Sequence, residues 1–263
     1  MTQPSQPQNA ELWHQIFALG HPKLQSYQRF NKRLPSPPRC KLCSAPFRGI
    51  GGVVMAMTGR RPSNRNPRFC SRCDHFIRAF PGGAEVEMSM LFADVRGSTS
   101  LAERVSATEY GRLMNAFYAA ATAALVATDG FVIDVVGDEV VGLYPPGFSG
   151  PDHARKAIHA ARDLLAAAGR SGTLPIGVAV HTGVAFIGTV SGAEEGIADV
   201  RALGDSINTA ARLASQAAPG EALISDAACA AAGQPMSDLD HRNLVLKGKA
   251  EPVGVRVLHA QAV

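Results

Sequence analysis

The stretch FVIDVVGDEVVGLY, residues 131–144, contains two runs of apolar and β-branched residues on either side of a Gly-Asp pair. A two-residue tip between such runs is a strong signal for a β-hairpin, so we expect one strand on each side of Gly137 and Asp138. Upstream, the chain from Glu85 to Phe92 alternates into an apolar strand. The fold is therefore expected to be built around a sheet that contains these strands.

Helical spacing of apolar residues alternates with further strand patterns along the rest of the chain. Ser98 or Thr99 is expected to cap one long helix that ends near Asp129. Further helices and strands are expected over 152–168, 175–183, 184–192, 205–216 and 221–225. This order predicts an α+β fold in which helices cover one face of a mainly antiparallel sheet.

The overall composition hides a charge asymmetry. The 263 residues carry 26 Lys and Arg against 22 Asp and Glu, and 46% are apolar, as in an ordinary globular protein. Residues 1–80 hold 13 of the basic residues and two acidic ones, a balance of +11, whereas the remainder carries −7. The sequence has no membrane-spanning apolar stretch, and its start is too polar for a signal peptide, so a cytoplasmic protein with two different regions is expected.

Four of the five cysteines form two CxxC pairs separated by 26 residues. These are Cys40 with Cys43 and Cys70 with Cys73. In a chain without an export signal such pairs favour metal ligation over disulfides, and four thiolates match the tetrahedral geometry of structural Zn²⁺. An iron centre, a redox dithiol and unligated cysteines are the alternatives, and Cys229 is expected to be a small packed residue.

These patterns divide the chain into three regions. We expect an N-terminal helix and linker over 1–34, a four-cysteine zinc module over 35–82 and the α+β domain over 83–263. A helix is expected to begin at or just after the second cysteine pair. Zinc with a basic surface is compatible with nucleic-acid binding, but the arginines follow no periodic recognition helix, so a docking or regulatory surface is favoured.

Two aspartates end neighbouring expected strands. Asp94 precedes a Gly-Ser-Thr turn that opens a helix, and Asp138 lies at the hairpin tip. If the strands are adjacent, both carboxylates meet at one sheet edge beside backbone N–H groups, where they can hold Mg²⁺ or Mn²⁺ together with a polyphosphate. Taken singly, Asp94 is equally compatible with a helix cap and Asp138 with a turn.

Three segments resemble, in order and spacing, the signature segments of class III adenylate/guanylate cyclase catalytic domains. They are LFADVRGSTSLAE (91–103), DVVGDEVVGLY (134–144) and DVRALGDSINTAARL (199–213). The resemblance implies a ferredoxin-like βαββαβ core over about 88–260 and a head-to-tail homodimer. It also implies the conversion of a nucleoside triphosphate to a 3′,5′-cyclic nucleotide and pyrophosphate.

The resemblance also assigns roles to individual residues. Asp94 and Asp138 would ligate two Mg²⁺ or Mn²⁺ ions with help from the Val95 backbone. Asn208 and Arg212, which share one helix face, would come from the partner subunit to orient the ribose and stabilise the transition state. The triphosphate would be bound by Gly97, Ser98, Thr99 and Lys247, with Lys249 as the alternative lysine.

The two positions that would read the purine base depart from the adenylate cyclase pattern. Asp134 replaces the usual lysine, and Arg201 replaces the usual aspartate or threonine. This pair is compatible with guanine, with adenine or with an ion pair that fills the pocket, and ATP is favoured because most bacterial-looking members are adenylate cyclases. The leading hypothesis is an active homodimeric cyclase coupled to a zinc module, and the alternative is a catalytically silent cyclase-like binding module.

Overall fold

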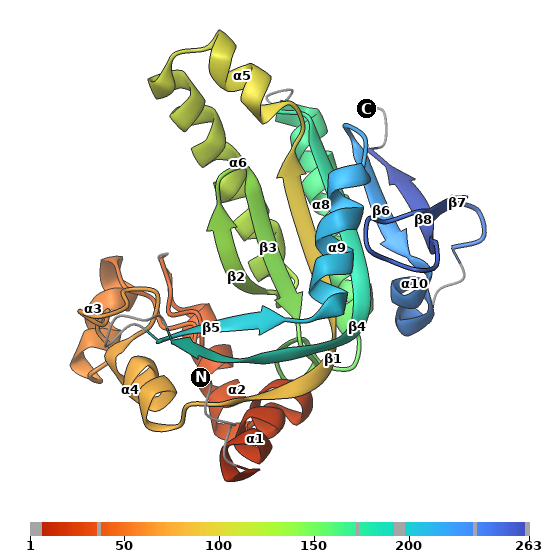
Figure 1. Ribbon diagram of the computed structural model, residues 1–263. Helices are drawn as coiled ribbons and strands as arrows, with labels where there is room; N and C mark the ends of the chain where they lie inside the picture. Colours follow the sequence, from red (N-terminus) through yellow and green to blue (C-terminus); the bar gives the residue numbers. More distant parts are fainter. Residues whose placement is uncertain (1–6, 36–37, 172–173, 192–197, 234–235, 261–263) are drawn as a thin grey trace. The chain divides into compact units, whose positions relative to one another are not determined.

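The computed structural model describes residues 7–35, 38–171, 174–191, 198–233 and 236–260 (Figure 1). The chain forms two compact units, which are considered separately. The first, called here the metal unit, comprises Met1–Val86 and Phe186–Ala202. The second, called the core unit, comprises Glu87–Ala185 and Leu203–Val263. No helix in the described ranges is long and apolar enough to cross a membrane.

The strands form one eight-stranded sheet in the order β2-β3-β1-β4-β6-β8-β7, and β5 pairs with β4. Their bounds are β1 Gly83–Val95, β2 Phe131–Val136, β3 Glu139–Tyr144, β4 Ile176–Ser191, β5 Ala198–Leu203, β6 Glu221–Ser225, β7 Asp240–Leu244 and β8 Val253–His259. β3 is antiparallel to both β1 and β2, β8 is antiparallel to β6 and β7, and β4 and β6 are parallel. The predicted α+β class with a mainly antiparallel sheet and helices is confirmed.

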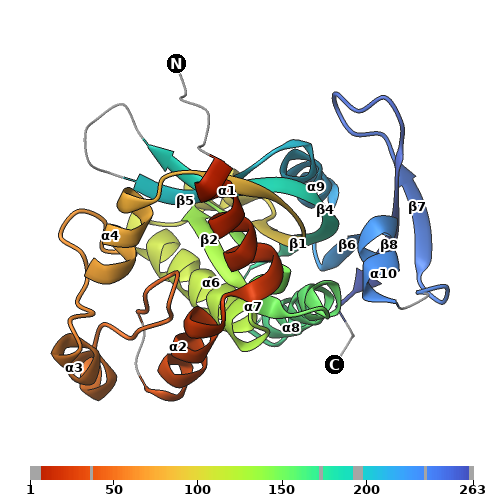
Figure 2. The ribbon, with the colours of Figure 1, turned by 90° about the horizontal axis from the view of Figure 1, so that it is seen from below.

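The helices of the core unit are α5 Ser98–Arg104, α6 Ala107–Ala127, α7 Pro146–Ser149, α8 His153–Ser171, α9 Asp205–Gln216 and α10 Asp226–Ala232. α6 and α8 lie side by side (Figure 2) and share a hydrophobic core with inward-facing strand residues such as Leu91, Ala93 and Val178. Burial of this apolar surface is the main force that holds the unit together.

α9 lies against the face of the sheet opposite to α6 and α8 (Figure 1), so the helices do not all cover one face as the sequence had predicted. Ile176 and Val178 face the α6–α8 core, so Gly177 between them faces α9. A Cβ on Gly177 would lie 2.9 Å from the carbonyl oxygen of Ala217, the residue after α9, and one on Gly183 would lie 2.6 Å from the Ser206 hydroxyl. These two glycines therefore allow the helix to approach β4 closely.

Three expectations about individual elements of the core unit were wrong. The single long helix is two helices, because Val105 is extended and the Ser106 hydroxyl accepts from the Glu109 backbone to cap α6. Ser98 caps no helix, since its hydroxyl instead donates to the Asp138 carboxylate. The two strands expected on either side of Gly183 are one strand, β4, because this glycine accommodates α9 rather than making a turn.

The metal unit contains more helix than the sequence indicated. Its helices are α1 Pro7–His14, the π-helix Gln15–Gly20, α2 Pro22–Arg33, α3 Gly49–Met57 and α4 Ser71–Ala79. α4 begins directly after Cys70, as predicted. Trp13 and Phe17 stack with centroids 5.6 Å apart, and the Trp13 indole donates to the Phe80 carbonyl oxygen, so the N-terminal segment packs on the end of α4.

Replacement of Gly177 with valine is expected to lower the free energy of unfolding by about 1–3 kcal/mol, because α9 must move off the sheet. Gly111→Ala is the matched control, since a Cβ at this position in α6 meets no atom within 4 Å. It is expected to be neutral or slightly stabilising. Urea unfolding followed by circular dichroism measures both changes, and equal midpoints for the two variants would contradict the close-packing argument.

Candidate functional site

The register between β1 and β3 brings Asp94 and Asp138 together. Asp94 lies opposite Glu139, and the backbone N–H of Val95 donates to the Asp138 carbonyl oxygen at 3.0 Å. Both aspartates are partly buried. Two carboxylates thus lie at one end of adjacent strands, which is an oxygen-donor set suited to a hard divalent cation.

Arg96 and Ser98 already contact these two carboxylates. The Arg96 guanidinium forms an ion pair with Asp94 and donates from Nη1 to the Ser215 carbonyl oxygen at 2.9 Å, while the Ser98 hydroxyl donates to Asp138. Burial lowers the pKa of Arg96, and the Asp138 and Glu139 carboxylates oppose this shift. The sequence pattern did not reveal Arg96 as part of the site, although it lies within the quoted 91–103 segment.

The same strand ends concentrate negative charge. The pKa of Glu139 is raised by burial and by the neighbouring carboxylates of Asp138 and Asp134. Such a raised carboxyl pKa marks a region where added positive charge is favourable. Asp94, Asp138 and the Val95 backbone therefore fit the divalent cations that the sequence predicts, and the turn of Gly97, Ser98 and Thr99 follows directly.

The second set of predicted residues lies on α9. Asn208 is exposed and Arg212 is partly buried, four positions further along the helix. The Arg212 guanidinium lies close to Gly248, about 3.5 Å from where a Cβ would stand. Leu246 is buried, which anchors the 246–249 segment beside the helix.

Of the two candidate lysines, Lys249 pairs with Asp205 at the start of α9, and the Lys247 side chain is exposed. The Lys249 ammonium lowers the pKa of the Asp205 carboxyl. Nearby His181 has its pKa lowered to about 4 by burial and by Lys249, so its ring is neutral at pH 7. The Asp205–Lys249 pair was not predicted, because the two residues are 44 positions apart.

The four paired cysteines form a cluster inside the metal unit. Their sulfur atoms all lie within 4.8 Å of one another, and all four residues are buried. Sulfurs bound to one Zn²⁺ at about 2.3 Å lie roughly 3.8 Å apart in a tetrahedron. The Sγ atoms of Cys43 and Cys70 are 3.7 Å apart, a separation that matches shared metal ligation and is too long for a disulfide.

Backbone and side-chain hydrogen bonds hold the cluster in place. The Cys70 N–H donates to Cys40 Sγ at 3.2 Å. From α2, Gln28 donates to the Leu42 carbonyl oxygen at 2.8 Å and Asn31 to the Cys43 carbonyl oxygen at 2.7 Å. Helix α2 is therefore hydrogen-bonded directly to the segment that contains the first cysteine pair.

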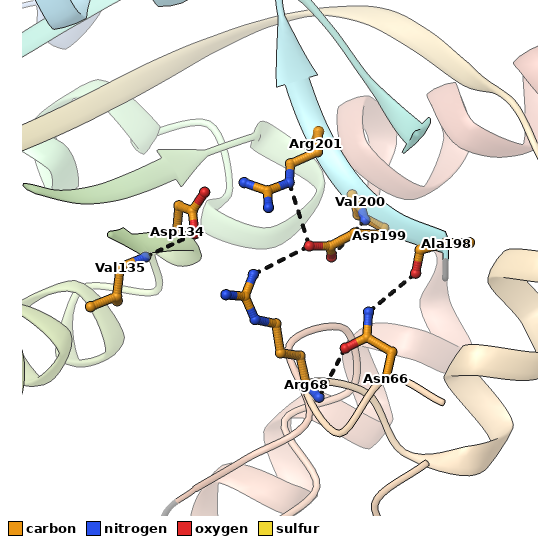
Figure 3. A network of polar contacts seen from close by, with 8 residues as sticks. All are labelled: Asn66, Arg68, Asp134, Val135, Ala198, Asp199, Val200 and Arg201. Atoms are coloured by element: carbon orange, nitrogen blue, oxygen red, sulfur yellow. Dashed lines mark hydrogen bonds and ion pairs between the residues drawn. The ribbon is translucent and has the colours of Figure 1, made fainter. Parts of the chain in front are cut away.

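The residues expected to read the base have partners of their own. Asp134 in the core unit accepts from the Val135 backbone N–H at 3.1 Å. Arg201 in the metal unit lies 3.4 Å from the carboxylate of Asp199, which also meets Arg68 (Figure 3). The sequence had indicated neither Asp199 nor Arg68 as relevant to this position.

Comparison with known proteins places the α+β domain in a family. Residues 83–258 match the adenylate and guanylate cyclase catalytic domain. The chain belongs to this family, which the three signature-like segments at 91–103, 134–144 and 199–213 had led us to expect.

Individual relatives are distant. An uncharacterised protein of Rhizobium meliloti (strain 1021) is 30% identical over 184 residues, which cover 65% of this chain and 18% of that protein. An adenylate cyclase of Anabaena cylindrica is 28% identical over 139 residues, covering 48% of this chain and 26% of that protein. The chain therefore spans less than a third of the length of these relatives. The guanylyl cyclase Cya2 structure superimposes with a TM-score of 0.61 at 22% identity, over 67% of this chain and 93% of that one, which supports the fold.

We expect the cysteine cluster to hold about one zinc ion per chain when the protein is purified without chelator. Cys70→Ser is expected to lose the zinc and most of the stability of the metal module, because bound zinc supplies much of the folding free energy of such modules. Cys229→Ala, which changes the buried cysteine outside the cluster, is expected to keep it. Metal analysis after gel filtration measures this, and iron or no metal in the wild type would contradict zinc.

Proposed function

We propose that this protein is a nucleotidyl cyclase that converts ATP or GTP to the 3′,5′-cyclic nucleotide and pyrophosphate at a homodimer interface. The observation that carries the proposal is the hydrogen-bonded register of β1 and β3, which sets Asp94 and Asp138 side by side. The membership of the cyclase family adds the reaction class.

In this proposal Asp94, Asp138 and the Val95 backbone hold two Mg²⁺ or Mn²⁺ ions. When bound, these ions lower the pKa of the attacking 3′-hydroxyl and neutralise charge on the phosphates. Ser98 orients the Asp138 carboxylate by its hydrogen bond, and Gly97 and Thr99 offer backbone N–H groups to phosphate oxygens. Binding of a cation to Asp94 would require the Arg96 guanidinium to release this carboxylate.

In this proposal α9 of the partner subunit supplies the residues that contact the ribose and stabilise the transition state. Asn208 orients the ribose, and Arg212 stabilises the charge that develops on the phosphates. Lys247, whose side chain is exposed, binds the triphosphate, whereas the ion pair of Lys249 with Asp205 holds the segment on α9. The carboxylates and α9 each provide the groups that the other lacks, so two chains in head-to-tail arrangement complete each site.

Asp134 and Arg201 select the purine in this proposal, and ATP is the favoured substrate. Asp134 accepts from the 6-amino group of adenine while Arg201 donates to N1. The same two groups also fit guanine, with Asp134 accepting from N1–H and the 2-amino group. Parallel assays with ATP and GTP decide between these bases.

The alternative function is a silent cyclase-like module that acts through protein contacts. The Asp94–Arg96 ion pair favours it, because an internal cation occupies a carboxylate that the active enzyme needs for metal. A silent module would form no cyclic nucleotide with either purine and either metal, so one assay separates the two functions.

Asp94→Ala is expected to lower kcat at least about 100-fold with Mn²⁺, because a carboxylate ligand of the catalytic metals is lost. Asp152→Ala is the matched control, since this aspartate is exposed and pairs only with Arg155 among the ion pairs described for it. Chromatography of the cyclic product from ATP and from GTP gives the rates. Turnover that survives Asp94→Ala would contradict the metal assignment.

Mixing Asp94→Ala with Arg212→Ala chains is expected to restore activity, because each mixed dimer contains one site with neither change. Random pairing of equal amounts makes half of the dimers mixed, so about a quarter of the wild-type activity should return. A mixture of Asp94→Ala and Asp138→Ala chains should stay inactive, since both changes affect the same half of every site. Equal recovery in the two mixtures would argue against a site shared between subunits.

A further inference from the structure

Asp199 lies between Arg68, which belongs to the cysteine-containing segment, and Arg201 (Figure 3). Its Oδ2 atom is 3.3 Å from Arg68 Nη1 and 3.4 Å from Arg201 Nε, and its Oδ1 atom accepts from the Val200 backbone N–H at 2.9 Å. The Asp199 side chain is only 15% exposed, whereas those of Arg68 and Arg201 are 42% and 37% exposed. Asp199 Oδ2 therefore forms ion pairs with two guanidinium groups that come from different segments of the chain.

The position of Arg68 depends on both CxxC segments, which are residues 40–43 and 70–73. Its backbone N–H donates to the Asn66 side chain at 3.2 Å, and its carbonyl oxygen accepts from the backbone of Lys41, next to Cys40, at 3.0 Å. Asn66 is buried and donates from Nδ2 to the Ala198 carbonyl oxygen at 3.2 Å. The segment that leads into Cys70 thus contacts the first described residue of β5 as well as the Asp199 side chain.

We propose that Arg68 and Asp199 are positioning residues that make the orientation of Arg201 depend on metal in the cysteine cluster. The proposal rests on the proposed function, in which Arg201 contacts the purine. With metal bound, Arg68 shares the charge of Asp199, so Asp199 holds Arg201 less tightly and its guanidinium reaches the base. Without metal the two CxxC segments no longer hold Arg68 beside Asp199. Asp199 then pairs more tightly with Arg201 and draws the Arg201 guanidinium away from the purine.

The geometry also sets the size and type of the effect. Both ion pairs are partly exposed and use one nitrogen each, and pairs of this kind are weak. We therefore expect a change of roughly two- to fivefold in nucleotide affinity. Because Arg201 contacts the base and not the reacting phosphorus, the change should appear in KM and leave kcat unaltered.

Hydrogen exchange of the full-length protein tests the link itself and requires no turnover. Amides of 198–203 are expected to exchange faster after zinc is removed with a chelator, and faster in Arg68→Ala than in the wild type. Arg65→Ala is the matched control, because Arg65 is an exposed arginine of the same segment and its described hydrogen bond comes from the backbone. Unchanged exchange in both Arg68→Ala and the chelated protein would overturn the proposal.

Nucleotide affinity tests the consequence. Arg68→Ala should raise KM for ATP and for GTP roughly two- to fivefold relative to Arg65→Ala, and Arg68→Lys should restore part of the loss. In an Asp199→Asn background Arg68→Ala should have no further effect, since the carboxylate that couples the arginines is gone. An additive effect in that background would overturn the proposal even if zinc content is normal.

Equilibrium binding of a fluorescent ATP analogue is measured for the same variants. This measurement tests the contribution of Arg201 to nucleotide affinity even if the protein has no turnover. Loss of product with intact, Arg68-dependent binding would contradict the proposed cyclase activity alone. Normal turnover with binding that ignores Arg68 would contradict the positioning role alone. Binding that responds to neither zinc nor Arg68 would overturn the inference in either case.

Discussion

The hydrogen bond from the Val95 backbone to the Asp138 carbonyl oxygen fixes the register on which the candidate site depends. A shift of one residue between β1 and β3 would turn one of the two aspartates to the opposite face, because side chains alternate along a strand. The register is held in turn by the buried face of β1, where Leu91, Ala93 and Val95 pack into the α6–α8 core. Core packing on one face thus determines where the carboxylates stand at the strand end.

The opposite face of the sheet imposes the second constraint. Gly177 and Gly183 carry no side chain toward α9, so the helix lies close enough for Ser206 to donate to the Val184 carbonyl oxygen at 2.8 Å. This close contact holds α9 against β4, and the Arg212 guanidinium lies near Gly248. The 246–249 segment then follows the helix, since Lys249 pairs with Asp205.

Sequence patterns predicted the elements whose structure is determined by residues close together in the chain. The Gly137–Asp138 tip predicted the hairpin because few residues tolerate the required turn, and the CxxC pairs predicted the cluster because spacing limits how thiolates can meet. β5 was missed because ADVRAL mixes charged and apolar residues and becomes a strand only by pairing with β4. The contacts of Arg96 and Asp199 join segments more than 100 residues apart, which no periodicity encodes.

The charge asymmetry gains a structural explanation from the same contacts. Of the two carboxylates among residues 1–80, Asp74 is buried and accepts from Ser63 and from Arg78, so it neutralises little of the surface. Asp199, which is distant in sequence, adds a carboxylate to the basic unit and places it between two arginines. Arg68, Asp199 and Arg201 all belong to this one unit, so these contacts are internal to it. The carboxylate that is missing from residues 1–80 is thus supplied by β5, which pairs with β4 and not with the cysteine-containing segment.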